Sequence, residues 1–163
     1  MVVLRDFIKQ DVEYLIEYLN NDEVTKFLTS RIPTPYTLEN AEWWVDIGSK
    51  EKINKAIVVE GVFVGAVGAA VGEYEYQRSA EIGYWLAQKY WGKGIATKAV
   101  KKVTTSVFSS TEVVRLFAPV FGPNIASMRV LEKCGYKQEA VLQKALFKNG
   151  SYFNCHLFAK VRS

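Results

Sequence analysis

Hydrophobic positions along the chain follow two periods, one typical of helices and one typical of strands. After Asp11, a good N-cap residue, apolar side chains recur at the i, i+3, i+4, i+7 spacing of one helical face, at Val12, Leu15, Ile16 and Leu19. A second helix is predicted from its N-cap Thr37 to Ile47, with Gly48 in the left-handed conformation that often ends a helix.

Two more helices are predicted in the second half of the chain. One covers Ala96–Phe108, with its apolar residues on one face and its lysines on the other. The next has Asn124 as its N-cap, ends at Cys134 and is followed by Gly135.

Runs of β-branched and aromatic residues between turn residues predict the strands. They are Val2–Arg5, Lys55–Glu60, Val62–Val67, Ala69–Tyr76, Ala80–Leu86, Val113–Val120, Glu139–Phe147 and Tyr152–Val161. Gly61 and the sequence KNG mark hairpin turns. Antiparallel strands therefore precede a single β-α-β crossover, which predicts an α+β protein whose residues 1–163 form one domain.

Composition narrows the classes of partner. The net charge is +4 and no long run of Lys or Arg appears, which favours a small anionic ligand over nucleic acid. No apolar stretch approaches the roughly 20 residues of a membrane span, and the run MVVL is interrupted at Arg5, so neither a membrane segment nor a signal peptide is expected. The two cysteines have neither a disulfide framework nor metal-ligand spacing, so we expect a cytoplasmic protein without a metal.

The stretch QKYWGKGIATKAV, at Gln88–Val100, lies between a predicted strand and a predicted helix. The first-turn amides of that helix lack an intrahelical acceptor and lie at the positive end of the helix dipole. Gly92 and Gly94 leave room for a ligand, and Lys89 and Lys93 add positive charge. The pattern fits a phosphate or pyrophosphate site, although a glycine-rich turn with solvated lysines would have the same sequence.

Two common phosphate loops do not fit this stretch. A P-loop requires G-x-x-x-x-G-K-[ST], but Gly94 follows Lys93 here. A dinucleotide-binding loop requires a third glycine where this chain has Thr97, and its doubly wound sheet would not suit the antiparallel strands upstream.

Two motifs at this separation resemble the GNAT superfamily of acetyl-CoA-dependent N-acetyltransferases. They are EIGYWLAQKYWGKGIATKAV and, about 30 residues later, NIASMRVLEKCGY. Their residues are most similar to those of the ribosomal-protein N-terminal (alanine) acetyltransferases. The resemblance implies a GNAT-like fold. That fold has a central mixed, mostly antiparallel twisted sheet of about seven strands, with helices on both faces.

The resemblance also assigns roles in binding acetyl-CoA as cosubstrate. The main chain near Leu86 would pair with the pantetheine arm. The pyrophosphate would be bound at Lys89, Gly92, Lys93, Gly94, Ile95, Ala96 and the Thr97 hydroxyl. Asn124 and Ser127 would lie beside the pantetheine and the sulfur, and Lys133 would reach a phosphate.

This chain departs from the family pattern at three positions. Lys89 stands where Gln or Arg is usual, Leu131 stands where many members have a tyrosine acid, and Asn154 stands where an Asp is common.

The chemistry requires the acceptor ammonium to lose a proton and the departing thiolate to gain one. We predict Glu81 as the base and Ser127 as the donor to the thiolate. The alternatives are a solvated strand carboxylate and a serine that satisfies helix amides. Cys155 and His156 are adjacent in a strand and face opposite ways, so direct transfer is expected rather than an acyl-cysteine.

Acceptor binding is predicted at the segments Asp22–Ile47 and Gly72–Ser79, through the aromatic Tyr36 and Trp44 and the acidic Glu73 and Glu75. The alternative is that the pair Trp43 and Trp44 belongs to the helix core and the glutamates to a solvated hairpin. The resemblance implies that the acceptor is the N-terminal α-amine of a protein. A small-molecule amine (a polyamine, an amino acid or an antibiotic) and a non-catalytic acyl-CoA sensor remain alternatives, and the chain is expected to be a monomer or a homodimer.

Overall fold

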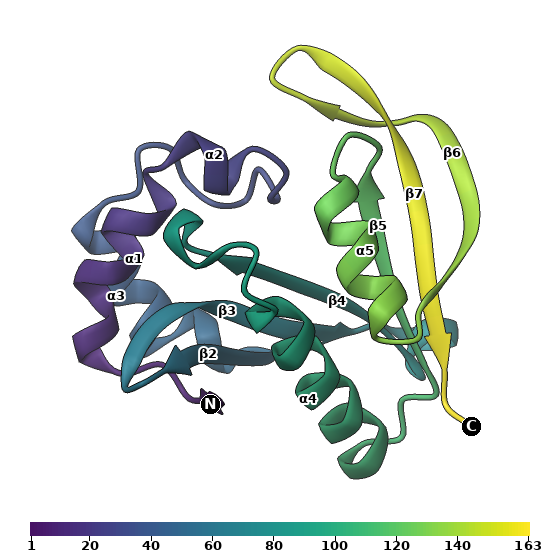
Figure 1. Ribbon diagram of the computed structural model, residues 1–163, viewed down its shortest axis with the longest axis horizontal. Coiled ribbons are helices and arrows are strands. Elements are labelled where there is room, and N and C mark those ends of the chain that lie inside the picture. Colours follow the sequence, from purple (N-terminus) through teal and green to yellow (C-terminus); the bar gives the residue numbers. More distant parts are fainter. The chain divides into compact units, whose positions relative to one another are not determined.

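Seven strands and five α-helices follow one another along residues 1–163, all of which the computed structural model describes (Figure 1). The strands are β1 (Val2–Arg5), β2 (Ile53–Val59), β3 (Val62–Val71), β4 (Ser79–Leu86), β5 (Arg115–Phe121), β6 (Lys137–Lys148) and β7 (Ser151–Val161). The helices are α1 (Val12–Leu19), α2 (Asp22–Thr25), α3 (Leu38–Asp46), α4 (Ile95–Ser110) and α5 (Ile125–Lys133). None of the helices combines the length and the apolar character needed to cross a membrane.

The strands form one sheet in the order β1-β2-β3-β4-β5-β7-β6. The pairs β1–β2, β5–β7 and β6–β7 are antiparallel, whereas β4 and β5 are parallel and are joined through α4. The predicted α+β class, with about seven mostly antiparallel strands and one β-α-β crossover, is confirmed.

The chain divides into two compact units. Unit 1 comprises Met1–Gly68 and Tyr84–Ala99, and unit 2 comprises Ala69–Gly83 and Val100–Ser163. Strands β3 and β4 and helix α4 each belong partly to both units. A single domain over residues 1–163 stays a prediction.

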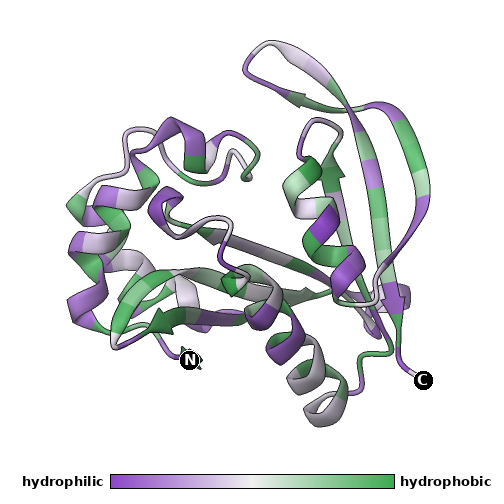
Figure 2. Cartoon of the chain, in the orientation of Figure 1, coloured by the Kyte–Doolittle hydropathy of each residue, from purple (hydrophilic) through white to green (hydrophobic).

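Unit 1 has an aromatic core between its helices and strands. Phe63 on β3 is 1% exposed and stacks on Tyr18 of α1, with ring centroids 6.0 Å apart. Phe7 packs edge-on against Trp44 of α3 at 5.6 Å. Helix α1 carries both apolar and polar segments (Figure 2), which is the amphipathic pattern that its spacing predicted.

Asp11 occupies the predicted N-cap position of α1, but its side chain does not cap that helix. Its carboxylate, which is 2% exposed, accepts two hydrogen bonds from the Arg5 guanidinium, at 2.7 and 2.8 Å, and one from the Ile8 amide, at 2.9 Å. The carboxylate raises the pKa of Arg5. Asp11 therefore joins β1 to the start of α1, because a bidentate cation competes better for a buried carboxylate than helix amides do.

The prediction for Gly48 was wrong. This residue does not adopt a positive φ but begins a 3-10 turn, Gly48–Lys50. A Cβ atom here would lie 2.5 Å from the Trp43 ring and 2.9 Å from the Trp44 ring. Glycine is required because two indoles approach the backbone, and that approach is a tertiary contact with no local signal.

The predicted strand Ala69–Tyr76 was also wrong. Its first residues continue β3 as far as Val71, and Tyr74–Tyr76 form a 3-10 turn. The Gly72 amide donates to the Ser79 carbonyl at 2.9 Å and closes the loop. A Cβ atom at Gly72 would lie 2.6 Å from the Tyr76 carbonyl oxygen, so the backbone turns tightly here. The strand therefore ends before this turn, although the alternation of aromatic and acidic residues continues in the sequence.

Other predicted turns and caps of the chain are confirmed. Thr37 accepts a hydrogen bond from the Asn40 amide at 3.2 Å, and Asn124 accepts one from the Ser127 amide at 3.4 Å. Gly135 has φ +85° after α5, and Gly150 has φ +78° in the β6–β7 turn.

Strand β6 forms one edge of the sheet, and its pairing with β7 is irregular. The register shifts between Gln138 and Ala140 and again between Leu142 and Leu146. Within the second shift, Lys144 has φ +53° and its amide donates to the Asn154 side-chain oxygen at 3.0 Å. The edge is therefore bent and its hydrogen bonds are interrupted.

Replacing Asp11 by Ala should lower the free energy of unfolding by about 2 kcal/mol, because the change leaves a partly buried guanidinium and an amide without their acceptor. Urea denaturation followed by circular dichroism measures the effect. Glu13→Ala, an exposed residue of the same helix, is the control and should change stability by less than about 0.5 kcal/mol. Equal effects of the two substitutions would contradict this account of Asp11.

Candidate functional site

The turn from β4 into α4 has the backbone geometry of an anion site. Gly92 and Gly94 both adopt left-handed conformations, with φ values of +73° and +75°. No atom lies within 4 Å of where a Cβ atom would stand on either glycine, so the outer side of the loop is open. Helix α4 follows at once, and its first amides lack intrahelical acceptors.

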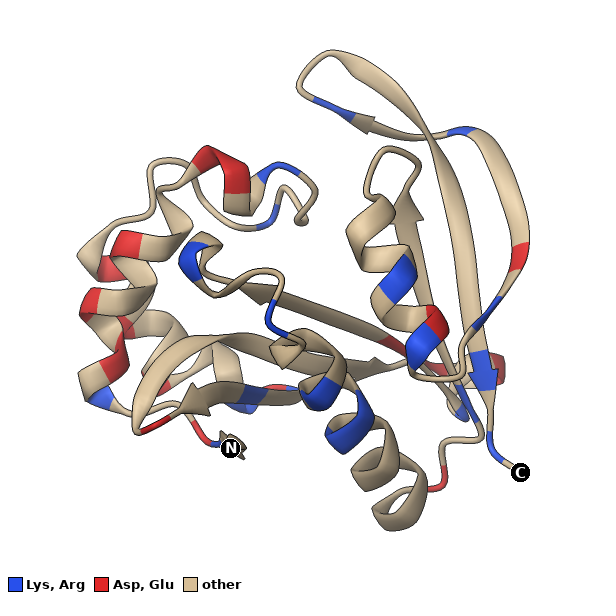
Figure 3. Cartoon of the chain, viewed as in Figure 1, with Lys and Arg blue, Asp and Glu red and all other residues tan.

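The lysines of α4 lie near its N-terminus, which is the positive end of the helix dipole. Lys93 precedes the helix, Lys98 lies in its first turns and Lys101 and Lys102 follow, with no acidic residue in the first turn. Figure 3 shows these positive charges along the first turns of α4. Cations near a helix N-terminus are unfavourable unless an anion is bound there, so the arrangement supports an anionic ligand.

Lys89 lies apart from this set of cations. Its ammonium is 3.9 Å from the Glu17 carboxylate and 5.5 Å from the centre of the Tyr18 ring, both on α1. The Tyr90 ring is 5.6 Å from both Lys89 and Lys93. The structure thus places the Lys89 side chain against α1, and Lys93 is the cation within the glycine loop.

The carbonyl of Leu86, at the end of β4, already has one intrachain partner. It accepts a hydrogen bond from the Trp91 indole nitrogen at 2.9 Å. A carbonyl oxygen has two lone pairs, so one remains for a ligand. Sequence reasoning did not assign a role to Trp91, although an aromatic residue inside a cationic glycine loop was a visible signal.

In unit 2, the start of α5 carries two of the predicted residues. Asn124 uses its side-chain oxygen to cap the helix, which leaves its amide nitrogen to donate. Ser127 is half-buried one turn later. Lys133 is exposed in the last turn, roughly 9 Å along the helix axis from Ser127 at 1.5 Å per residue.

Glu81 lies on β4 in register with Phe117 of the parallel strand β5. Paired residues of neighbouring strands share a face, as do residues two apart, so Ser79 and Phe117 flank Glu81 on one face of the sheet. The buried neighbours Ala80 and Leu116 point to the opposite face. Glu81 is exposed, so its carboxylate can reach water or an amine.

A hollow of about 530 Å³ lies on this part of unit 2. It is lined by Ala70, Gly72, Glu73, Tyr74, Tyr76, Ser79 and Phe117. Among the residues predicted to bind the acceptor, Glu73 lines the hollow, and Glu75 is exposed in the adjoining 3-10 turn. Phe117 was missed, because the register of β4 against β5 that places it beside Glu81 has no signal in the sequence.

The other two residues predicted to bind the acceptor lie in the core of unit 1. Tyr36 is 6% exposed, and burial raises its pKa to about 12. Trp44 packs on Phe7 in the same hydrophobic cluster. Both rings are therefore used for packing.

Four other titratable side chains of unit 2 are buried or hydrogen-bonded within the unit. Burial raises the pKa of the Cys134 and Cys155 thiols, which disfavours a nucleophilic thiolate. The Tyr136 hydroxyl is 2.7 Å from that of Thr104, and burial raises its pKa to about 12. His156 contacts Gln138 at 2.9 Å through Nδ1.

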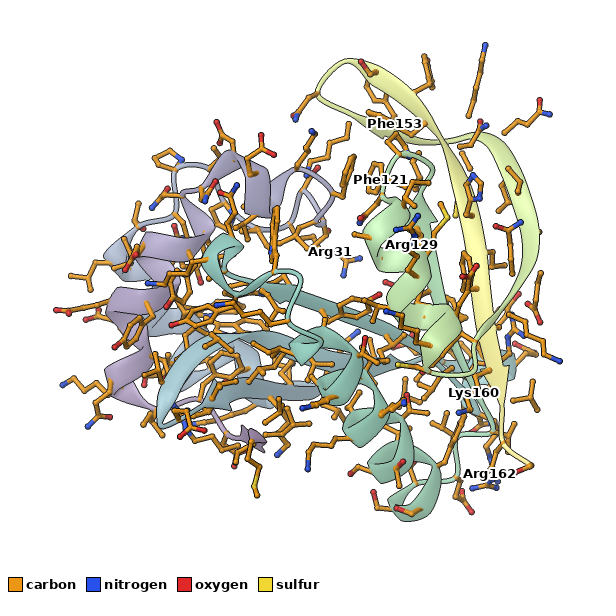
Figure 4. The ribbon with its side chains drawn as sticks, viewed as in Figure 1. Arg31, Phe121, Arg129, Phe153, Lys160 and Arg162 are labelled. Atoms are coloured by element: carbon orange, nitrogen blue, oxygen red, sulfur yellow. The ribbon has the colours of Figure 1, made fainter.

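Aromatic packing also organises the far end of unit 2. Phe121 of β5 and Phe153 of β7 lie next to each other in Figure 4, with ring centroids 5.3 Å apart in an edge-to-face arrangement. Near the end of the chain, Arg162 donates to the Phe108 carbonyl at 3.1 Å. These contacts connect β5, the strand that carries Phe117, with β7 and with the end of α4.

Comparison with known proteins adds three findings. Residues 2–137 match the family described as "Acetyltransferase (GNAT) domain". The uncharacterised N-acetyltransferase YoaA of Bacillus subtilis (strain 168) is 29% identical over 174 residues, which covers 99% of this chain and 93% of that protein. The ribosomal-protein-serine acetyltransferase of Escherichia coli (strain K12) is 31% identical over 84 residues, or 52% of this chain and 47% of that protein.

Among solved structures, a GNAT-family acetyltransferase from Bacillus anthracis superposes with a TM-score of 0.83 and 25% sequence identity. The match covers 98% of this chain and 94% of that one.

Replacing Gly94 by Ala should weaken the binding of CoA about tenfold, because an L-residue is disfavoured in the left-handed region by roughly 1–2 kcal/mol and the loop would relax. Isothermal titration calorimetry with CoA measures the change.

The matched control is Gly150→Ala, at a glycine with φ +78° and equally open surroundings in the β6–β7 turn. It should lose similar stability but bind CoA normally. If both variants bound CoA as the parent does, the loop would not be the CoA site.

Proposed function

Because this chain belongs to the GNAT acetyltransferase family, we propose that it transfers the acetyl group of acetyl-CoA directly to the N-terminal α-amine of a protein. Two relatives that match 99% of the chain are likewise named N-acetyltransferases. The observation that carries the cosubstrate is the pair of left-handed glycines in front of a cationic helix start. The choice of a protein as acceptor is supported by the name of the Escherichia coli relative, a ribosomal-protein-serine acetyltransferase.

Each part of the site has a task in this proposal. The amides of Gly92–Ala96 and the Thr97 hydroxyl donate to the pyrophosphate, and Lys93 balances its charge. The second lone pair of the Leu86 carbonyl and the amide nitrogen of Asn124 bind the pantetheine arm. The Lys133 ammonium contributes to phosphate binding by charge.

Glu81 accepts the proton of the acceptor ammonium, directly or through one water molecule. An α-amine has a free pKa of roughly 8, whereas a lysine amine has one of about 10.4, so a modest base is sufficient for an α-amine. The nitrogen lone pair then attacks the thioester carbonyl, an N–C bond forms, and the C–S bond breaks. The Ser127 hydroxyl passes its proton to the departing thiolate and regains one, directly or through water, from the attacking nitrogen, which must lose a second proton to become the amide, so charge does not accumulate on sulfur.

Release of free thiol from acetyl-CoA, measured with a panel of amines, tests the acceptor class. Peptides with a free N-terminus should be turned over, and the same peptides with a blocked N-terminus should not. Turnover of polyamines, amino acids or aminoglycosides but not of peptides would replace the protein acceptor by a small molecule. Binding of acetyl-CoA without turnover of any amine would indicate a sensor.

Replacing Ser127 by Ala should lower kcat by roughly tenfold to a hundredfold, while the Kd for CoA changes by less than about threefold. The reason is that protonation of the thiolate contributes to the transition state rather than to cosubstrate binding. Stopped-flow turnover and calorimetry measure the two constants.

Ser109→Ala, at an exposed serine near the end of α4, is the control and should leave both constants unchanged. Normal turnover of the Ser127 variant would remove this hydroxyl from the mechanism.

A further inference from the structure

The loop that connects β3 to β4 exposes side chains for which unit 2 has no packing use. Tyr74 and Tyr76 are 81% and 72% exposed, and Glu73 and Glu75 alternate with them. Tyr74 adopts φ +52°, which is uncommon for a bulky residue. Contiguous exposed apolar patches mark binding sites, and two tyrosines of one short loop are exposed together here.

The hollow of about 530 Å³ extends from this loop to the strands next to Glu81, the proposed base. Its lining includes Ser79 and Phe117, the two residues that flank Glu81 on its face of the sheet. Residues two apart on a strand are separated by roughly 6.6 Å. The hollow therefore begins within about two residue lengths of the carboxylate that would meet the acceptor amine.

The charge around the hollow is negative. The cations nearest in the chain have partners of their own: Arg78 pairs with Glu112 at 3.3 Å, and Arg115 pairs with Glu139 through bonds of 2.6 and 2.9 Å. The carboxylates of Glu73, Glu75 and Glu81 take no part in an ion pair within the chain. They are therefore available to bind a cationic group of the acceptor.

We propose that this hollow, which we call the Tyr74 pocket, binds a positively charged side chain one or two residues after the acetylated N-terminal residue. The pocket would thereby select protein acceptors that carry Lys or Arg at the second or third position. This inference rests on the proposed function, because Glu81 must meet the α-amine while the pocket binds the neighbouring residue.

Two interactions give the selection. The faces of Tyr74 and Tyr76 attract a cation through their ring quadrupoles. A long aliphatic stem packs on these rings and beside Phe117, whose own face already carries the Arg115 guanidinium 6.0 Å from its centre. Glu73 and Glu75 add electrostatic attraction, which salt screens because the carboxylates are exposed. Acidic or short neutral residues would gain neither interaction.

Two peptides of identical sequence except for Lys or Gln at the third position test the proposal. The parent enzyme should acetylate the Lys peptide with a kcat/KM about threefold to tenfold higher, mostly through KM, and 0.5 M NaCl should reduce the preference. Tyr74→Ala and the double variant Glu73→Gln/Glu75→Gln should remove the preference, because kcat/KM for the Lys peptide falls to the value for the Gln peptide. Tyr74→Phe keeps the ring and should retain the preference.

The controls match each change elsewhere in unit 2. Tyr152→Ala removes a tyrosine that is 66% exposed, and Glu132→Gln removes an exposed carboxylate on α5; both should keep the parent's preference. Equal kcat/KM for the two peptides with the parent enzyme, or a preference that survives Tyr74→Ala, would overturn the Tyr74 pocket.

A binding measurement separates this inference from the proposed function. Calorimetry with the N-acetylated forms of both peptides reports pocket binding without any turnover. Tighter binding of the Lys product that is lost in Tyr74→Ala supports the pocket even if catalysis is slow. Acetylation of both peptides without preference defeats only the pocket, whereas absence of acetylation together with equal binding defeats both proposals.

Discussion

The left-handed conformation of Gly92 and Gly94 is the constraint on which the candidate site depends. These glycines turn the end of β4 into the start of α4 without placing a side chain over the first-turn amides. The same helix start carries lysines that its dipole disfavours, so the free protein keeps an electrostatic imbalance there. In the proposed function, a bound pyrophosphate relieves that imbalance, and this relief contributes to its binding free energy.

Features whose cause lies within a few residues could be predicted from the sequence. The caps Thr37 and Asn124 and the glycine after α5 depend on hydrogen bonds or backbone angles of neighbouring residues, and all three are observed. The predictions for Gly48 and Asp11 failed because the roles of these residues depend on tertiary contacts. The Trp43 ring packs against Gly48, and the Arg5 guanidinium binds the Asp11 carboxylate.

The two parts of the candidate site differ in the same way. The glycine loop is a local motif, so its conformation followed from its residues. The surroundings of Glu81 depend on the register of β4 against β5, which placed Phe117 beside it, and on the loop that closes at Gly72. Tyr36 looked like an acceptor residue in sequence, yet the core of unit 1 uses its ring. An aromatic side chain in a loop does not reveal from sequence whether packing or ligand binding will use it.

The shifted register of β6 has a consequence for solubility. Edge strands with exposed apolar residues can template pairing with other chains, and Val141, Leu142 and Phe147 are 43%, 45% and 63% exposed. Around the bulge, however, the regular pairing is cut into the short stretches Ala140–Leu142 and Leu146–Lys148. Cross-β assembly requires flat segments of about six residues. The bend at Lys144 thus lets the chain keep an apolar edge in water without offering a continuous template for aggregation.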